Sequence, residues 1–193
     1  MVRAYYIVFS CYGFWLPNDP RGSWSDFVAA WDLYRAGGSA TKVNTRASLA
    51  GQSYDKTKAN EVKSQLNYPP VILTGIQARS VANGFASTCT KSALVIHACA
   101  ILPDHIHLVI ARHRYPIEQV VNLLKGNATK RLRADGLDPF PEGVRHTPWS
   151  AGLWKVFLNS PESIWKAIQY VDANPVKDGK RAQHWNFVRP YEC

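Results

Sequence analysis

The sequence predicts an α+β domain built on a ferredoxin-like βαββαβ antiparallel sheet, and three observations carry this prediction. Short segments of strand character alternate with longer segments of helical periodicity, in the order strand, helix, strand, strand, helix, strand, helix. Pro103-Asp104 joins two of the strand segments and is typical of a hairpin turn. The last helix exceeds what this fold needs, so we expect helices on one face of the sheet plus an added C-terminal helix.

The N-terminal part is predicted to contain one strand, an insertion and one helix. Residues 5–11 (YYIVFSC) are aromatic and β-branched, which favours a strand. The composition then turns polar, and we expect an insertion at about 20–67 with at most short helices, within a single domain that spans 1–193. Pro69 and Pro70 stand where a helix can begin, and apolar positions continue from there toward Cys89.

The middle of the chain is predicted to form the hairpin and a second helix. Residues 93–102 (ALVIHACAIL) and 105–111 (HIHLVIA) are its two strands. Apolar positions from Ile117 to Leu132 follow a helical period, and this helix is expected to end near Asp135-Gly136.

The C-terminal part is predicted to form a short strand around Trp154 to Leu158 and then the added helix. Ser160-Pro161 is typical of an N-cap followed by proline at the first helical position. Asn174 precedes Pro175, which disfavours continuing the helix, so we expect Tyr170 in the last turn or so.

Composition narrows the class of protein. With 193 residues and 46% hydrophobic content the chain can bury a core, and its formal charge of +9 favours polyanions such as nucleic acid, although a solvated basic surface would look the same. No long apolar run and no secretory signal are present, so we expect a soluble, intracellular protein. The four cysteines have no CxxC or zinc-finger spacing, which predicts reduced thiols.

His105 and His107 form the first candidate site. They lie two residues apart on a predicted strand, so both imidazoles project from one face and offer a pair of ligands for a divalent metal. Two polar residues on the solvent face of a half-buried strand remain the ordinary alternative.

Tyr170 and Asn174 form the second candidate site. They lie four residues apart on the last helix and therefore share one face. If that face covers the histidine strand, Asn174 can supply an oxygen ligand, and Mg²⁺ or Mn²⁺ suits such an imidazole and amide set. A packed tyrosine and a helix-terminating asparagine are the structural alternative.

The two sites together resemble a known family. LPDHIHLVI is similar to the HUH motif, histidine-hydrophobe-histidine, of the single-tyrosine transposases that mobilise insertion sequences through single-stranded DNA. YVDANPVKDG is similar to the tyrosine signature of the REP-associated branch of that family. With LWKVFL between them, the resemblance covers about Tyr5 to Gly179 in element order, whereas the insertion has no counterpart that we can match.

The resemblance implies an HUH endonuclease fold and a metal-dependent single-strand DNA endonuclease and strand transferase. Tyr170 would be the nucleophile and form a covalent 5′-phosphotyrosine, while His105, His107 and Asn174 would bind Mg²⁺ or Mn²⁺. The implied partner is single-stranded DNA with hairpin structure, near the gene's own flanks or in genomic repeats. A cytoplasmic, nucleoid-associated place in a prokaryotic cell is implied, and monomer and homodimer both stay open.

Several other residues are weaker candidates. The polar face of the second helix and the segment after Tyr170 could follow a phosphate backbone, although any amphipathic helix has such a face. These cations are Lys125, Lys130, Arg131, Arg133, Lys177, Lys180 and Arg181. Asp104 is either an imidazole-orienting partner or a turn residue. Trp149 and Trp154 either stack on bases or pack in the core.

Three other functions remain open at this point. The first is a non-catalytic regulator that binds DNA hairpins and descends from such a transposase. The second is an RNA-binding module, which would need aromatic residues on the central strands that this sequence lacks there. The third is a metal hydrolase that uses water as nucleophile, with Tyr170 structural.

Overall fold

The structure, a computed structural model, describes residues 1–14, 16 and 56–192. The chain divides into two compact units, one made of Met1–Cys11 with Ile72–Cys193 and the other of Tyr12–Val71. Within the second unit the described part contains α2 (Lys56–Ser64). Most of the insertion predicted at about 20–67 lies outside the described residues, so that insertion stays a prediction.

The first unit is built on a four-stranded antiparallel sheet. Its strands are β1 (Ala4–Ser10), β2 (Ile96–Ile101), β3 (His105–Ala111) and β4 (Trp154–Leu158), arranged in the order β2-β3-β1-β4. The predicted hairpin forms β2 and β3, closed by a hydrogen bond from Leu102 N to His105 O. This order and element sequence confirm the predicted ferredoxin-like class.

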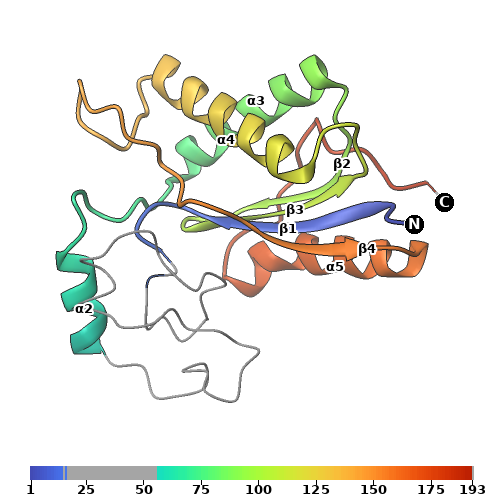
Figure 1. Ribbon diagram of the computed structural model, residues 1–193, viewed down its shortest axis with the longest axis horizontal. Helices are drawn as coiled ribbons and strands as arrows, with labels where there is room; N and C mark the ends of the chain where they lie inside the picture. Colours follow the sequence, from blue (N-terminus) through green and yellow to red (C-terminus); the bar gives the residue numbers. More distant parts are fainter. Residues whose placement is uncertain (15, 17–55, 193) are drawn as a thin grey trace. The chain divides into compact units, whose positions relative to one another are not determined.

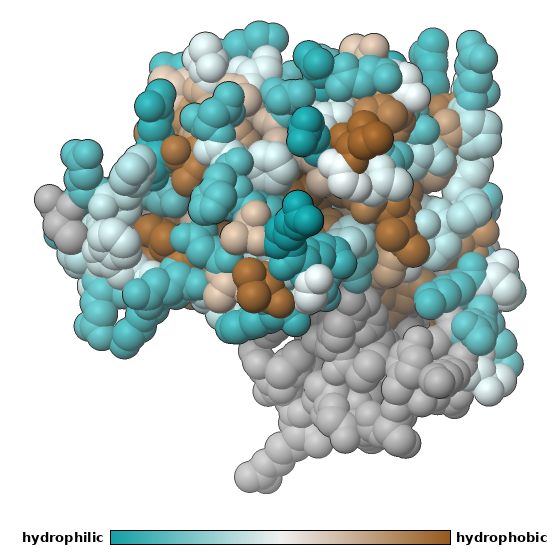
Figure 2. Space-filling model, turned by 180° about the vertical axis from the view of Figure 1, so that it is seen from behind, coloured by the Kyte–Doolittle hydropathy of each residue, from teal (hydrophilic) through white to brown (hydrophobic). Residues whose placement is uncertain are grey.

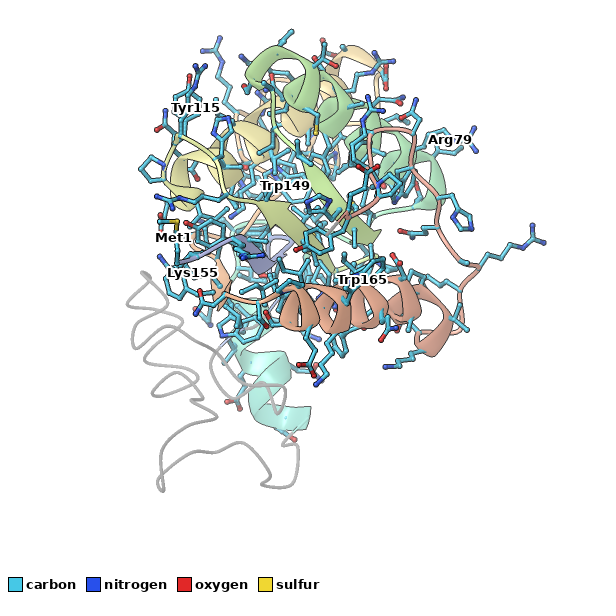
Figure 3. The ribbon with its side chains drawn as sticks, turned by 90° about the vertical axis from the view of Figure 1, so that its right-hand side faces the viewer. Met1, Arg79, Tyr115, Trp149, Lys155 and Trp165 are labelled. Carbon is cyan, nitrogen blue, oxygen red and sulfur yellow. The ribbon has the colours of Figure 1, made fainter. Side chains whose placement is uncertain are left out.

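Helices cover both faces of this sheet (Figure 1). On one face lie α3 (Gly75–Ser92) and α4 (Ile117–Ala134), and on the other lies the added helix α5 (Pro161–Lys177). Side chains alternate along β1, so Phe9 meets Phe85 of α3 whereas Tyr6 meets Tyr170 of α5. In the side view Trp165 lies on α5 and Trp149 lies above the sheet (Figure 3).

The first helix of this unit begins later than predicted. Pro69, Pro70 and the apolar residues after them are not helical, and α3 starts at Gly75. Thr74 caps it, because its hydroxyl accepts from Gln77 N at 3.3 Å and the Gln77 side chain accepts from Thr74 N at 2.9 Å. This capping box fixes the start of α3 at Gly75, because it satisfies two N–H groups that would otherwise be unpaired.

The last helix ends later than predicted. α5 continues through Asn174 and Pro175 to Lys177, so Tyr170 lies about two turns before its end rather than in the last turn. Pro175 removes one backbone donor but is buried, and later amides close the helix, from Asp178 N to Asn174 O and from Lys180 N to Pro175 O. A proline near the C-terminal end costs one hydrogen bond and leaves the remaining turn intact.

The α5 face of the sheet is lined by small side chains where the helix crosses it. Ala4, Ala98 and Ala100 are buried there against Ile164, Ile168 and Val171 of α5. Small residues let the helix approach closely, which brings the side chains on its flanks within reach of the strands. From behind, apolar side chains reach the surface in separate small groups (Figure 2). No helix among the described residues is long and apolar enough to cross a membrane.

Candidate active site

His105 and His107 point from β3 toward α5, as the strand alternation predicts. Their ring centroids lie 4.6 Å apart and their planes are at 74°. The register pairs Ser10 with His105 and Val8 with His107, so both imidazoles lie on an inner strand, near the end where β3 begins. His107 is only 6% exposed, which separates it from an ordinary solvent-face histidine.

Each imidazole is oriented through its Nδ1 atom. His105 Nδ1 lies 2.6 Å from Asp104 Oδ1, and His107 Nδ1 lies 2.7 Å from the hydroxyl oxygen of Tyr6. A partner that accepts the Nδ1 proton puts the lone pair on Nε2, and this is how metal-binding histidines are usually fixed. Asp104 is therefore an imidazole partner as well as a turn residue, and Tyr6 plays the same part for His107.

The environment keeps His107 neutral. Burial lowers the pKa of His107 to about 3, with nearby His105 acting in the same direction and Asp104 opposing it. A neutral imidazole is the form that binds metals. His107 therefore has its ligand form throughout the range in which most proteins work.

Tyr170 lies beside the histidines. Its ring centroid is 6.0 Å from that of His107 and 5.9 Å from that of Tyr6, in both cases edge to face. Tyr170 is 46% exposed, in contrast to the buried His107. Lys177 Nζ lies 5.0 Å from the centre of the Tyr170 ring and brings a positive charge to it.

Asn174 lies one turn after Tyr170 on α5, on the same face of the helix. Its Nδ2 atom is buried and has no hydrogen-bond partner among the described residues. An unpaired buried amide atom is costly. Because amide oxygen and nitrogen are interchangeable by a flip, the same position can present Oδ1 to a cation. The part of the chain that the structure describes contains no cluster of three His, Cys, Asp or Glu residues suited to a metal.

Tyr6 is the site residue that sequence reasoning missed. Its ring lies parallel to His107 within 8° and meets Trp154 of β4 edge to face at 5.2 Å. Burial, and then the charge of Tyr170 and a hydrogen bond with it, raise the pKa of Tyr6 well above its usual value. Tyr6 thus stays protonated and can donate to the Tyr170 oxygen while accepting from His107. The tyrosine pair in the first strand was a visible signal, but its partners depend on register.

The cations of α4 lie away from this site, on the opposite face of the sheet (Figure 1). Lys125 is buried, and its Nζ donates to Ser150 O at 2.9 Å and Gly152 O at 2.7 Å. Arg131 and Arg133 are exposed and paired with Asp135 and Asp138 at 2.9 and 2.8 Å. Lys130 is exposed.

The candidate cations after Tyr170 lie at the end of α5 or just beyond it. Lys177 contacts the Tyr170 ring, and Lys180 and Arg181 follow as exposed side chains, Lys180 with its Nζ 3.1 Å from Asp178 Oδ2. Trp149 is 2% exposed, packs against Phe9 and donates its indole N–H to Lys125 O, so it is a core residue. Trp154 lies at the site beside Tyr6.

Comparison with known proteins decides the family. The sequence model of the family described as "Transposase IS200 like" matches residues 66–172, more than half of the chain. The chain belongs to the IS200-like transposase family. The matched range of this transposase includes His105, His107 and Tyr170 and ends two residues before Asn174. No curated protein sequence matches it significantly.

Two solved structures are similar to this chain. One is a REP-associated tyrosine transposase bound to a REP hairpin, with 11% identity and a TM-score of 0.49, covering 92% of this chain and 68% of the other. The second is from Deinococcus radiodurans R1 and is described as a transposase, with 11% identity, a TM-score of 0.46 and 94% of both chains covered.

Proposed function

We propose that this transposase cleaves and rejoins single-stranded DNA through a covalent phosphotyrosine on Tyr170, assisted by a divalent metal. The observation that carries the proposal is that Tyr170 from α5 lies beside the two histidines of β3. The Tyr170 ring is 6.0 Å from that of His107, whose ring is 4.6 Å from that of His105. Family membership supports a transposase function, and the geometry supports this particular chemistry.

Tyr170 would supply the attacking oxygen. The phenolic oxygen forms a bond to the scissile phosphorus, the bond from phosphorus to the 3′ oxygen breaks, and the released 3′ oxygen takes up a proton. One phosphoester replaces another, so a second 3′ hydroxyl can reverse the step without ATP. Tyr6 donates a hydrogen bond that stabilises the developing tyrosinate, and Lys177 adds positive charge at the ring.

His105, His107 and Asn174 would hold Mg²⁺ or Mn²⁺, because two oriented imidazoles and a buried unpaired amide fit such an ion. When bound, the ion would neutralise charge on the phosphate and act as a Lewis acid. Asp104 and Tyr6 fix the imidazoles and so reduce the reorganisation needed on binding.

We propose single-stranded DNA with hairpin structure as the partner. The net charge of +9 favours a polyanion. Three cations follow Tyr170 in the chain: Lys177 at the end of α5, then Lys180 and Arg181. Tyr170 is exposed on the surface of α5, so the flexible backbone of an unpaired strand can reach its side chain.

The test is a covalent adduct. Purified protein is mixed with Mn²⁺ or Mg²⁺ and labelled single-stranded oligonucleotides from the flanks of its own gene, and products are separated on a denaturing gel. The proposal predicts label on the protein, abolished by Tyr170→Phe and by chelator. Metal-dependent binding without an adduct would favour a hairpin-binding regulator, and cleavage that persists in Tyr170→Phe would favour water as the nucleophile.

A further inference from the structure

A cavity of about 430 Å³ lies on the other flank of α5, away from Tyr170. It is bounded by α5, by β2 and by residues 182–191 of the C-terminal segment. The lining of this cavity includes none of the four proposed site residues, His105, His107, Tyr170 and Asn174. The proposed chemistry therefore does not use the cavity. Its volume is within the range typical of sites for small molecules.

Hydrogen bonds fix the wall formed by the C-terminal segment. Arg189 N donates to Ile96 O, and the Gln183 side chain pairs with both backbone groups of Ile101 at 2.8 Å. The indole N–H of Trp185 donates to Cys99 O at 3.2 Å. These bonds satisfy the outer edge of β2, so the cavity is formed before a ligand arrives and little ordering is needed on binding.

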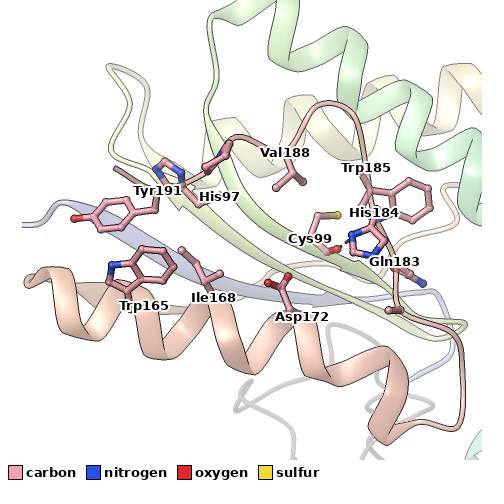
Figure 4. A pocket seen from close by; sticks show the side chains of 12 residues that line it. His97, Cys99, Trp165, Ile168, Asp172, Gln183, His184, Trp185, Val188 and Tyr191 are labelled. Carbon is pink, nitrogen blue, oxygen red and sulfur yellow. Dashed lines mark hydrogen bonds between the residues drawn. The ribbon is translucent and has the colours of Figure 1, made fainter. Parts of the chain in front are cut away.

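Aromatic rings stand at both ends of the cavity (Figure 4). At one end Tyr191 contacts the rings of His97 and Trp165 edge to face, at 5.2 and 5.8 Å. At the other end lie His184 and Trp185. Trp165 is 43% exposed, a large apolar area for a single side chain at a surface. Such faces are the usual platforms for unpaired nucleobases.

Asp172 brings a carboxylate between these two aromatic ends (Figure 4). Within the described residues it makes no hydrogen bond or ion pair, and the nearby His184 influences it only through its charge. Partial burial raises the pKa of Asp172, and the charge of His184 opposes this shift. Asp172 is exposed at the wall of this cavity, and a carboxylate without a protein donor is open to a ligand with N–H groups.

We propose that this cavity binds an unpaired guanine base of the DNA strand, stacked on the aromatic rings and hydrogen-bonded to Asp172. A carboxylate accepts two parallel hydrogen bonds, and guanine has two neighbouring donors, N1–H and the N2 amino group. Adenine and thymine lack such a donor pair. This inference rests on the proposed function, because it requires single-stranded DNA as the partner.

The cavity and the nucleophile can be reached by one strand. Asp172 follows Tyr170 by two residues, which places them about 200° apart around α5 and about 3 Å apart along its axis. A strand attached at Tyr170 would pass the C-terminal end of the helix to reach the other flank, where Lys177, Lys180 and Arg181 are exposed. The base in the cavity would therefore lie a few nucleotides from the scissile phosphate.

The test uses fluorescein-labelled oligothymidine 15-mers with one central guanine, hypoxanthine or adenine, at low salt with chelator so that nothing is cleaved. Fluorescence anisotropy should give a Kd about tenfold lower for guanine than for adenine, with hypoxanthine, which lacks the amino group, between them. Asp172→Asn should abolish the guanine preference. Equal Kd values for the three oligonucleotides, or a preference retained in Asp172→Asn, would overturn the proposal.

Controls separate this proposal from folding effects and from the proposed function. Glu162→Gln removes another exposed carboxylate of α5, one paired with Lys166 outside the cavity, and should keep the preference. Trp165→Ala should weaken binding of all three oligonucleotides, with unchanged circular dichroism. A guanine preference without any Tyr170 adduct would count against the nuclease alone, and an adduct without an Asp172-dependent preference would count against the guanine site alone.

Discussion

The hydroxyl oxygen of Tyr6 lies 2.7 Å from Nδ1 of His107, and the two rings are parallel within 8° at a centroid distance of 5.9 Å. The same tyrosine meets the ring of Tyr170 edge to face. One side chain of β1 therefore contacts both a proposed metal ligand on β3 and the proposed nucleophile on α5. It positions the two groups relative to each other.

Tyr6→Phe should weaken metal binding while leaving the fold intact. The ring and its stacking stay, but His107 loses the group that fixes its ring orientation, and such partners typically change metal affinity about tenfold or more. Titration calorimetry with Mn²⁺ measures this directly, without any need for DNA cleavage.

Tyr5→Phe is the matched control for that variant. Tyr5 is the adjacent residue of β1, points to the other face and has its ring against Phe157. Its Mn²⁺ affinity should equal that of the unchanged protein. Equal affinities for Tyr6→Phe and Tyr5→Phe would show that the Tyr6 hydroxyl does not position His107.

His107 should make the metal-free protein sensitive to acid. The pKa of this imidazole is about 3 when folded, against 6.5 when exposed, so between these pH values the unfolded chain binds more protons and stability falls as pH falls. At about pH 4.5 the loss relative to neutral pH should be about 2–3 kcal/mol. Urea unfolding of the protein and of His107→Gln across this range measures it, and parallel pH dependences would contradict the assignment.

Lys125 should act in stability rather than in DNA binding. Lys125→Met leaves the carbonyls of Ser150 and Gly152 without their ammonium donor, which should cost about 1–3 kcal/mol of unfolding free energy. Lys130→Met, at an exposed position of the same helix, should leave stability nearly unchanged. Chemical denaturation compares the two, and a similar, small effect of both would show that the buried lysine contacts contribute little.

Replacing Gly84 should destabilise the crossing of α3 and α4. A Cβ atom there would lie 2.6 Å from the Cα atom of Ala128, so Gly84→Ala should force the helices apart and cost about 1–3 kcal/mol. Gly126→Ala, with nothing within 4 Å of its added Cβ, should instead stabilise α4 by about 0.5–1 kcal/mol. Thermal unfolding of both variants checks the opposite signs.

Local patterns in the sequence were enough for most elements of the first unit and for half of the site. Strand alternation alone places His105 and His107 on one face, and helix periodicity places Tyr170 beside Asn174. The predicted end of α5 was wrong. Proline disfavours a helical conformation of the residue before it, but here Pro175 is buried and the amides that follow it close the last turn.

The remaining site residues depend on tertiary structure. Tyr6 reaches His107 only because β1 pairs Val8 with His107, and this register cannot be deduced from either strand by itself. Lys125 looks like its exposed neighbours in the sequence, yet its amine turns inward to loop carbonyls that are 25 and 27 residues away. Long-range partners of this kind leave no local pattern.

Mass spectrometry of the protein after reaction with a metal ion and a cleavable oligonucleotide tests the central claim most directly. The account predicts that one tryptic peptide, that containing Tyr170, gains the mass of a nucleotide through its phosphate, and that the gain is lost in Tyr170→Phe. Nucleotide mass on another residue, or cleaved DNA without any modified peptide, would contradict the assignment of Tyr170 as the nucleophile.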